Sequence, residues 1–178
     1  VKDGDLLKVD TVINYHGSLS DSCHAFVAGT TTPEVQKLMD VTLKALYLGI
    51  DQAVVGNRIG DIGWAIQNYA ENEMGYGVVR EYIGHGIGPT MHEKPDVPHY
   101  GEAGRGTRLK AGMTITIEPM VNIGDWRSGE TADDGWTVRT LDGSLSCQYE
   151  HTLVITDDGP KILSSFDNDF DAKYLLKK

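Results

Sequence analysis

The chain has 178 residues, of which 40% are hydrophobic and 24% charged, and a formal net charge of −10 at pH 7. This composition is typical of one globular domain with a sizeable core. The acidic balance argues against nucleic-acid partners and anionic membranes, and no apolar run reaches the roughly 20 residues of a membrane helix. Cys23 and Cys147 lie far apart and form no Cys-x-x-Cys pair. We therefore expect two reduced thiols in a cytoplasmic protein.

Two strands are predicted first, Leu6 to Tyr15 and Ser18 to Val27, joined by the turn residues Asn14 to Gly17. A four-residue loop there would place Asp10 directly opposite Asp21, with both side chains on one face. Like charges in such a pair repel each other, and a bound metal ion is the simplest compensation. A solvated pair on an exposed sheet edge is the alternative, which the hairpin alone leaves open.

Two helices are predicted next. The first begins at a capping box formed by Thr31 and Glu34. The second begins at Gly56-Asn57 and ends at Gly75. We expect both helices to cover a sheet. In the second helix, the expected packing residues are Ile59, Ile62, Trp64, Ile66, Tyr69, Ala70 and Met74.

The rest of the sequence is predicted to form strands separated by turns and loops. The alternating residues of 113–120 put Met113, Ile115 and Ile117 on one face and Thr114, Thr116 and Glu118 on the other. The other predicted strands are 77–82, 136–140, 144–156 and 161–164, with loops at 95–107 and 125–134 and an acidic, solvated tail at 166–171. This order of elements predicts an α+β fold with a curved antiparallel sheet.

The segment from Gly84 to Pro95 carries the strongest chemical signal. Its glycines free the backbone, and it presents two histidines, His85 and His92. Four carboxylates lie in the predicted strands, where a lone charge is costly to bury: Asp10, Asp21, Glu118 and Glu150. One imidazole with four carboxylates suits a pair of divalent ions such as Mn²⁺, Fe²⁺, Co²⁺ or Zn²⁺. The pattern alone also allows a histidine whose hydrogen bonds are satisfied within the core, with the acidic residues scattered over the surface.

Several ordered motifs resemble those of the bacterial type I methionine aminopeptidases. They are Gly84-His85-Gly86-Ile87-Gly88, His92-Glu93-Lys94-Pro95, Thr116-Ile117-Glu118-Pro119-Met120, Asp134-Gly135-Trp136-Thr137-Val138, Ser146-Cys147-Gln148-Tyr149-Glu150-His151-Thr152, and Lys8-Val9-Asp10 with Asp21. The likeness runs from about Asp3 to Ser164. It implies the pita-bread fold of creatinases and aminopeptidases, in which a curved antiparallel sheet covered by helices holds a dinuclear metal site on its concave face.

The resemblance also implies the metal ligands. Two divalent ions (Co, Mn, Fe, Zn or Ni) would be bound by Asp10, Asp21, His85, Glu118 and Glu150. Asp10 would hold one metal, His85 and Glu118 would complete the other, and Asp21 and Glu150 would bridge the two. Glu118 would also take a proton from the nucleophilic water.

The remaining site residues are implied in the same way. His92 would contact the scissile amide and stabilise the tetrahedral intermediate, rather than ligate a metal. Met91, where many relatives carry an aromatic residue, and Trp136 would line the pocket for the methionine side chain. The implied reaction removes the N-terminal methionine from nascent polypeptides by hydrolysis. We expect no nucleic-acid or membrane partner, and a monomer when the protein is complete.

Two alternatives remain. An X-Pro aminopeptidase of the aminopeptidase P type shares the fold and ligands, but the short hairpin at 134–137 and the motif at 146–152 favour methionine release. A metal-free binding module on the same scaffold would be expected to lose a ligand, and none is lost here. Residues 1–178 are expected to form one catalytic domain. Because relatives carry a further N-terminal segment and only nine residues precede Asp10, we expect that segment to be missing or supplied as a separate chain.

Overall fold

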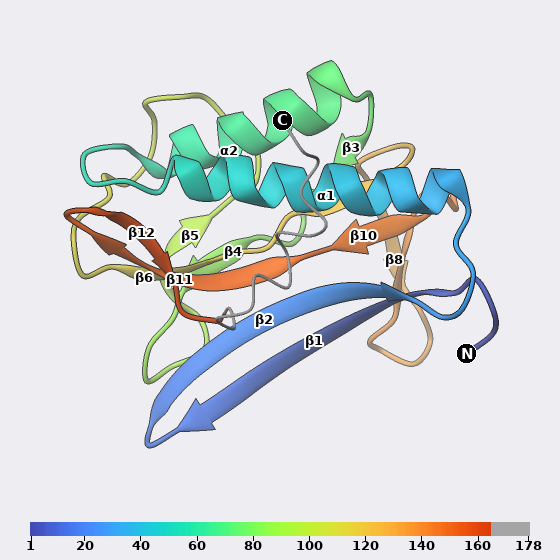
Figure 1. Ribbon diagram of the computed structural model, residues 1–178, viewed down its shortest axis with the longest axis horizontal. Coiled ribbons are helices and arrows are strands. Elements are labelled where there is room, and N and C mark those ends of the chain that lie inside the picture. The colour runs from blue at the N-terminus through green and yellow to red at the C-terminus, as the bar shows by residue number, and fades with distance from the viewer. Residues whose placement is uncertain (165–178) are drawn as a thin grey trace.

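The computed structural model describes residues 1–164, so the predicted acidic tail at 166–171 lies outside the described residues. A curved sheet forms one layer, two helices lie across one of its faces, and the β1–β2 hairpin extends away from them (Figure 1). All the strand pairs within residues 1–164 are antiparallel. The predicted α+β fold with a curved antiparallel sheet is therefore confirmed.

In the part of the chain that the structure describes, the main sheet has seven strands in the order β1-β2-β11-β6-β4-β5, with β12 paired to β11. Its strands are β1 Leu6–Tyr15, β2 Ser18–Val27, β4 Gly84–Gly86, β5 Glu93–Val97, β6 Thr114–Ile117, β11 Glu150–Thr156 and β12 Gly159–Ile162. A three-stranded sheet contains β3 Gly77–Val78, β7 Met120–Asn122 and β10 Ser146–Gln148, and a two-stranded sheet contains β8 Ser128–Thr131 and β9 Val138–Thr140. The order of the main sheet brings segments that are distant in sequence side by side.

The first hairpin has a tighter turn than predicted. His16 and Gly17 both have positive φ, 50° and 87°, which gives a two-residue loop. Asp10 therefore pairs with Cys23, and Asp21 pairs with Val12. The predicted direct pairing of the two aspartates is wrong by two residues. Because side chains alternate with a period of two, a shift of two keeps both carboxylates on one face as diagonal neighbours.

Both helices form where predicted, with small differences at their starts. The helix α1 Pro33–Asp51 is capped by Thr32, which accepts a hydrogen bond from the Val35 amide at 3.3 Å, so the predicted cap at Thr31 is wrong by one residue. The helix α2 Ile59–Gln67 begins after Arg58 and continues as the π-helical turn η1 Asn68–Glu73. Trp64 is 49% exposed, which contradicts its predicted packing role. The other expected packing residues of this segment are buried or packed against the core.

The hydrophobic core lies between the helices and one face of the main sheet. Ile115 and Ile117 of β6 and Leu153 and Ile155 of β11 are fully buried with the apolar side chains of both helices. The alternation of 113–120 therefore has the predicted orientation. The opposite face of the same strands carries polar groups, and this arrangement leaves that face available for a site.

Several later strands are shorter or divided. Pro119 has no N–H group to continue a ladder, so the predicted strand 113–120 is split into β6 and β7. The predicted strand 144–156 divides at Tyr149 into β10 and β11, which belong to different sheets. The predicted strands at 77–82, 136–140 and 161–164 are seen as β3, β9 and β12, and the predicted loops at 95–107 and 125–134 contain part of β5 and β8.

Two other expectations concern covalent chemistry and membranes. Cys23 and Cys147 are buried free thiols, as predicted. Among the described helices, none has the length and apolar character needed to cross a membrane.

Candidate metal centre

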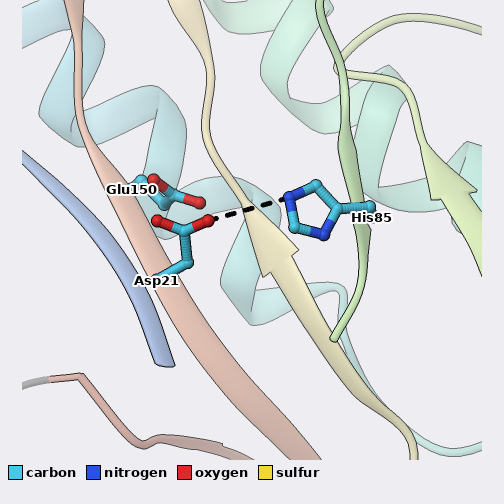
Figure 2. Close-up of side chains that lie close together, drawn as sticks. All are labelled: Asp21, His85 and Glu150. Atoms are coloured by element: carbon cyan, nitrogen blue, oxygen red, sulfur yellow. Dashed lines mark ion pairs between the residues drawn. The ribbon is translucent and has the colours of Figure 1, made fainter. Parts of the chain in front are cut away.

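Three buried side chains from three strands converge on the polar face of the main sheet (Figure 2). Asp21 of β2, His85 of β4 and Glu150 of β11 each offer a ligand atom, and these atoms lie within 4.8 Å of one another. The Nε2 atom of His85 is 3.9 Å from Oδ2 of Asp21. The geometry is that of a compact group of potential metal ligands.

Local packing fixes the strands that carry these groups. The Thr152 hydroxyl accepts a hydrogen bond from the Asp21 amide at 2.9 Å and donates one to the Asp21 carbonyl at 2.8 Å. This contact joins β11 to β2 beside the site. On the other side, a Cβ at Gly84 would lie 2.6 Å from the Thr116 carbonyl oxygen, and one at Gly86 would lie 2.5 Å from the Lys94 carbonyl oxygen. Glycine on both sides of His85 therefore lets β4 fit between β6 and β5.

Glu118 follows β6 directly and reaches the same group. Its Oε1 atom lies 3.5 Å from Nε2 of His85. The hydroxyl of Thr116 donates a hydrogen bond to Oε1 of Glu118 at 2.9 Å and accepts one from the His85 amide at 3.0 Å. One threonine therefore sets the spacing between these two predicted ligands.

Asp10 completes the group from β1. It is the diagonal neighbour of Asp21 in the hairpin, and the charge of Asp21 contributes to the raised pKa of Asp10. The structure therefore brings together all five predicted metal ligands, although the diagonal register of the hairpin differs from the predicted one. Their assignment as ligands stays a prediction.

Without a bound cation, the electrostatics of the group favour protonated over ionised carboxyl groups. Burial, followed by the charges of neighbouring carboxylates, raises the pKa of Glu150 to about 10. Burial also raises the pKa of Glu118 to about 8, against the hydrogen bond from Thr116. Burial also raises the pKa of Asp21. Asp10 is exposed, but partial desolvation and the charge of Asp21 raise its pKa as well. Burial lowers the pKa of His85, which favours the neutral imidazole that a metal needs.

Two of the carboxylate oxygens have no hydrogen-bond partner among the described residues. They are Oδ1 of Asp21 and Oε1 of Glu150, and both are buried. Unpaired buried acceptors are costly, and a divalent cation would satisfy them while neutralising the crowded charges. The residues present therefore fit divalent metal ions, with oxygen donors predominating and one nitrogen.

The predicted substrate-contacting residues lie at the edge of this group or beyond it. The ring of His92 is exposed and meets the ring of His85 edge-on, with 4.4 Å between the centroids. Both histidines line a cavity of about 340 Å³. Met91 is 36% exposed, and Trp136 is 87% exposed and is not enclosed by any part of the chain that the structure describes. The roles of these three residues stay predictions.

One residue close to the site is missing from the predicted set. His99 falls in the predicted loop 95–107, yet the structure buries it completely. Its Nε2 atom accepts a hydrogen bond from the Glu118 amide at 3.0 Å. Burial lowers the pKa of His99 to about 3, so the ring is neutral. Nothing in the local pattern of polar, proline and glycine residues marks this histidine as buried.

Comparisons with known proteins agree with this geometry. The model of metallopeptidase family M24 matches residues 1–157. Methionine aminopeptidase A of Synechocystis sp. is 49% identical over 164 residues, which are 90% of this chain and 63% of that protein. The chain thus spans slightly less than two thirds of the length of the first curated relatives it matches.

Solved structures show the same fold. The crystal structure of methionine aminopeptidase from Rickettsia prowazekii matches with a TM-score of 0.90 and 42% identity, covering 93% of this chain and 66% of that one. Prolidase from Pyrococcus furiosus matches with a TM-score of 0.72 and 26% identity, covering 94% of this chain and 43% of that one. These similarities confirm the predicted pita-bread fold.

Proposed function

The chain belongs to metallopeptidase family M24, and from this premise we propose that residues 1–178 are the catalytic domain of a methionine aminopeptidase. The substrate would be the N-terminal methionine of nascent polypeptides, removed by hydrolysis of the first peptide bond. The observation that carries the proposal is the buried convergence of Asp21, His85 and Glu150 beside Glu118. The higher identity to methionine aminopeptidases than to prolidase supports the choice within the family.

In this proposal the five clustered residues would hold two divalent ions. Such ions polarise a carbonyl group and lower the pKa of a water molecule. The metal would be Co, Mn, Fe, Zn or Ni. Because the carboxyl groups are protonated more readily here than in solution, binding of metal is expected to displace protons.

Glu118 would accept the proton of the attacking water. Its carboxylate lies 3.5 Å from Nε2 of His85, and its Oε1 atom is oriented by the Thr116 hydroxyl at 2.9 Å. A carboxylate held in place by a hydrogen bond beside the ligand group is suited to general base catalysis.

His92 would act on the substrate rather than on the metals. Its exposed ring borders the same cavity as His85 and meets that ring edge-on. A ring N–H there would donate to the substrate's amide group, where negative charge develops during attack. Met91 and Trp136 would contribute to the pocket for the methionine side chain, since a flexible thioether and an indole both pack well against methionine.

The proposed setting follows from the substrate. Nascent polypeptides emerge in the cytoplasm, and two free buried thiols suit a reducing compartment. We propose that the protein acts there as a monomer.

The function is tested by comparing two peptides. Metal-loaded protein is assayed with Met-Gly-Met and with an X-Pro tripeptide, and kcat/KM is measured for both. We expect Met-Gly-Met to be favoured by about 100-fold, since a shaped apolar pocket discriminates by roughly this factor. The reverse preference would identify an X-Pro peptidase, which the match to prolidase makes the second candidate. No hydrolysis of either peptide by metal-loaded protein would indicate a binding module.

A further inference from the structure

His99 lies outside the predicted ligand set but touches one member of it directly. Its Nε2 atom lies 3.0 Å from the main-chain nitrogen of Glu118, and its side chain is completely buried. We propose that His99 is a positioning residue, which fixes the main chain of Glu118 so that the carboxylate meets His85 in the metal centre. The reaction that this positioning serves rests on the proposed function.

The amide of Glu118 needs a partner that the sheet does not provide. The strand β6 ends at Ile117, whose partner in β11 is His151. Pro119 follows and interrupts the ladder because it lacks an N–H group. A buried main-chain N–H without an acceptor is costly. The imidazole of His99 supplies the hydrogen-bond acceptor that a neighbouring strand would otherwise provide for the Glu118 amide.

The protonation of the ring follows from that contact. Because Nε2 accepts the hydrogen bond, the proton of the neutral ring resides on Nδ1. The Nδ1 atom is buried and has no hydrogen-bond partner within residues 1–164. An apolar side chain would fill this space without burying an unpaired donor. The acceptor at Nε2 is therefore what histidine contributes at this position.

The helix α2 holds His99 from behind. A Cβ on Gly63 would lie 2.4 Å from the carbonyl oxygen of Tyr100 and 2.8 Å from that of Pro98. The helix therefore packs directly on the main chain that flanks the histidine. Gln67 adds a hydrogen bond from the Gly101 amide to its Oε1 atom at 3.0 Å. These contacts keep the ring pressed against the end of β6.

The main-chain amide and the carboxylate of Glu118 are thus each held by a hydrogen bond. His99 fixes its amide, and Thr116 binds its Oε1 atom at 2.9 Å while also bonding the His85 amide. Hydrogen bonds of this kind, one step removed from the metal, orient ligands, and their loss typically costs about 10- to 100-fold in metal affinity or activity. We expect an effect of that size when the acceptor at position 99 is lost.

The test compares His99→Leu, which removes the acceptor, with His99→Gln, whose amide oxygen can restore it. Dissociation constants for Co²⁺ are measured by calorimetry, and kcat and KM are measured with Met-Gly-Met. For His99→Leu we expect kcat to fall and the Co²⁺ dissociation constant to rise, each about 10-fold or more, with little change in KM. His99→Gln is expected to recover most of both losses. Leu38→Ala, in the buried face of α1, is the control that lowers Tm without changing either quantity.

Three results would overturn the proposal. They are wild-type values of kcat and Co²⁺ affinity in His99→Leu, equal losses in the leucine and glutamine variants, or losses no greater than those of Leu38→Ala. If His99→Leu does not fold, His99→Met takes its place and must remain below His99→Gln. Wild-type protein that binds Co²⁺ but does not cleave Met-Gly-Met would refute the proposed function alone, because the ratio of Co²⁺ affinities still tests His99.

Discussion

The Nε2 atom of His85 lies 3.5 Å from Oε1 of Glu118, and one hydroxyl group links the two residues. That hydroxyl, on Thr116, is bonded to the His85 amide at 3.0 Å and to the Glu118 carboxylate at 2.9 Å. The distance between a predicted nitrogen ligand and the predicted proton acceptor is therefore set by the sheet itself. His85 lies in β4 and Glu118 directly follows β6, and these two strands pair through Gly86 and Ile115. The positions of both residues are therefore fixed by the sheet.

Replacing Thr116 tests this link. Thr116→Val keeps the shape of the side chain but removes both hydrogen bonds, leaving the buried His85 amide without its acceptor. We expect the free energy of unfolding to fall by about 1–3 kcal/mol and kcat to fall about 10-fold or more. Thr116→Ser retains the hydroxyl and should remain close to the wild type in kcat. Equal kcat in the valine and serine variants would show that the hydroxyl does not orient Glu118.

Glu118→Gln removes the proposed proton acceptor without changing the size of the side chain. General base catalysis typically contributes about 10²- to 10⁴-fold, so we expect kcat for Met-Gly-Met to fall within that range at saturating metal. The control is Glu102→Gln, because the Glu102 side chain is 82% exposed in a loop outside the ligand group. Activity of Glu118→Gln near the wild-type level would remove Glu118 from the mechanism.

His92→Ala should separate substrate contact from metal binding. Loss of one donor to a developing negative charge typically lowers kcat by about 10²- to 10³-fold. Because His92 is not a proposed ligand, we expect the metal content of the purified variant to equal that of the wild type. His85→Ala, in contrast, should lose metal, as measured by elemental analysis. Loss of metal in His92→Ala would instead make this histidine a ligand.

The stability of the metal-free protein should depend on pH in a definite direction. The folded-state pKa values of Glu118 and Glu150 are raised from 4.5 to about 8 and about 10. The folded state therefore binds these protons more tightly than the unfolded chain does. This contribution to stability is fully present below the ordinary pKa of 4.5 and is lost as pH rises through the raised values.

Urea unfolding of chelator-treated protein should accordingly give a free energy of unfolding that decreases between about pH 7 and pH 9. Below about pH 6.5 the lowered pKa values of His85 and His99 act in the opposite direction. Saturating Mn²⁺ should flatten this decrease, because the cation replaces the protons. The lowered pKa values of Asp134 and Asp142, about 2 for each, act at more acidic pH and do not affect this range. A free energy that rises over the range, or the same slope with and without Mn²⁺, would contradict the assignment of a buried carboxylate cluster.

Local periodicity was sufficient to predict much of the scaffold. The alternation in 113–120 correctly separates Ile115 and Ile117 in the core from Thr116 and Glu118 beside the site, because side chains of a strand alternate between its faces. Helical spacing likewise places Ile62 and Ile66 inside. Trp64 lies between them in sequence but not on the buried face of the helix. Its apolar character alone therefore gives a wrong prediction of burial.

Other features depend on conformations or contacts that sequence does not show. The register of the first hairpin depends on positive φ at His16, which is uncommon for a residue other than glycine. The site residues Asp10 and Asp21 were nevertheless predicted on one face, because the error was an even number of residues. The burial of His99 could not be predicted, since its partner Glu118 is distant in sequence and its burial depends on how α2 packs against segment 98–100.

The central claim is that a metal ion bound by the carboxylate and histidine cluster supports removal of N-terminal methionine. The most direct measurement titrates chelator-treated protein with Co²⁺ while recording bound metal and methionine release from Met-Gly-Met. We predict no release without metal, release that rises with metal bound, and loss of both binding and release in Asp21→Asn. Full release by metal-free protein, or unchanged binding and release in Asp21→Asn, would contradict the claim.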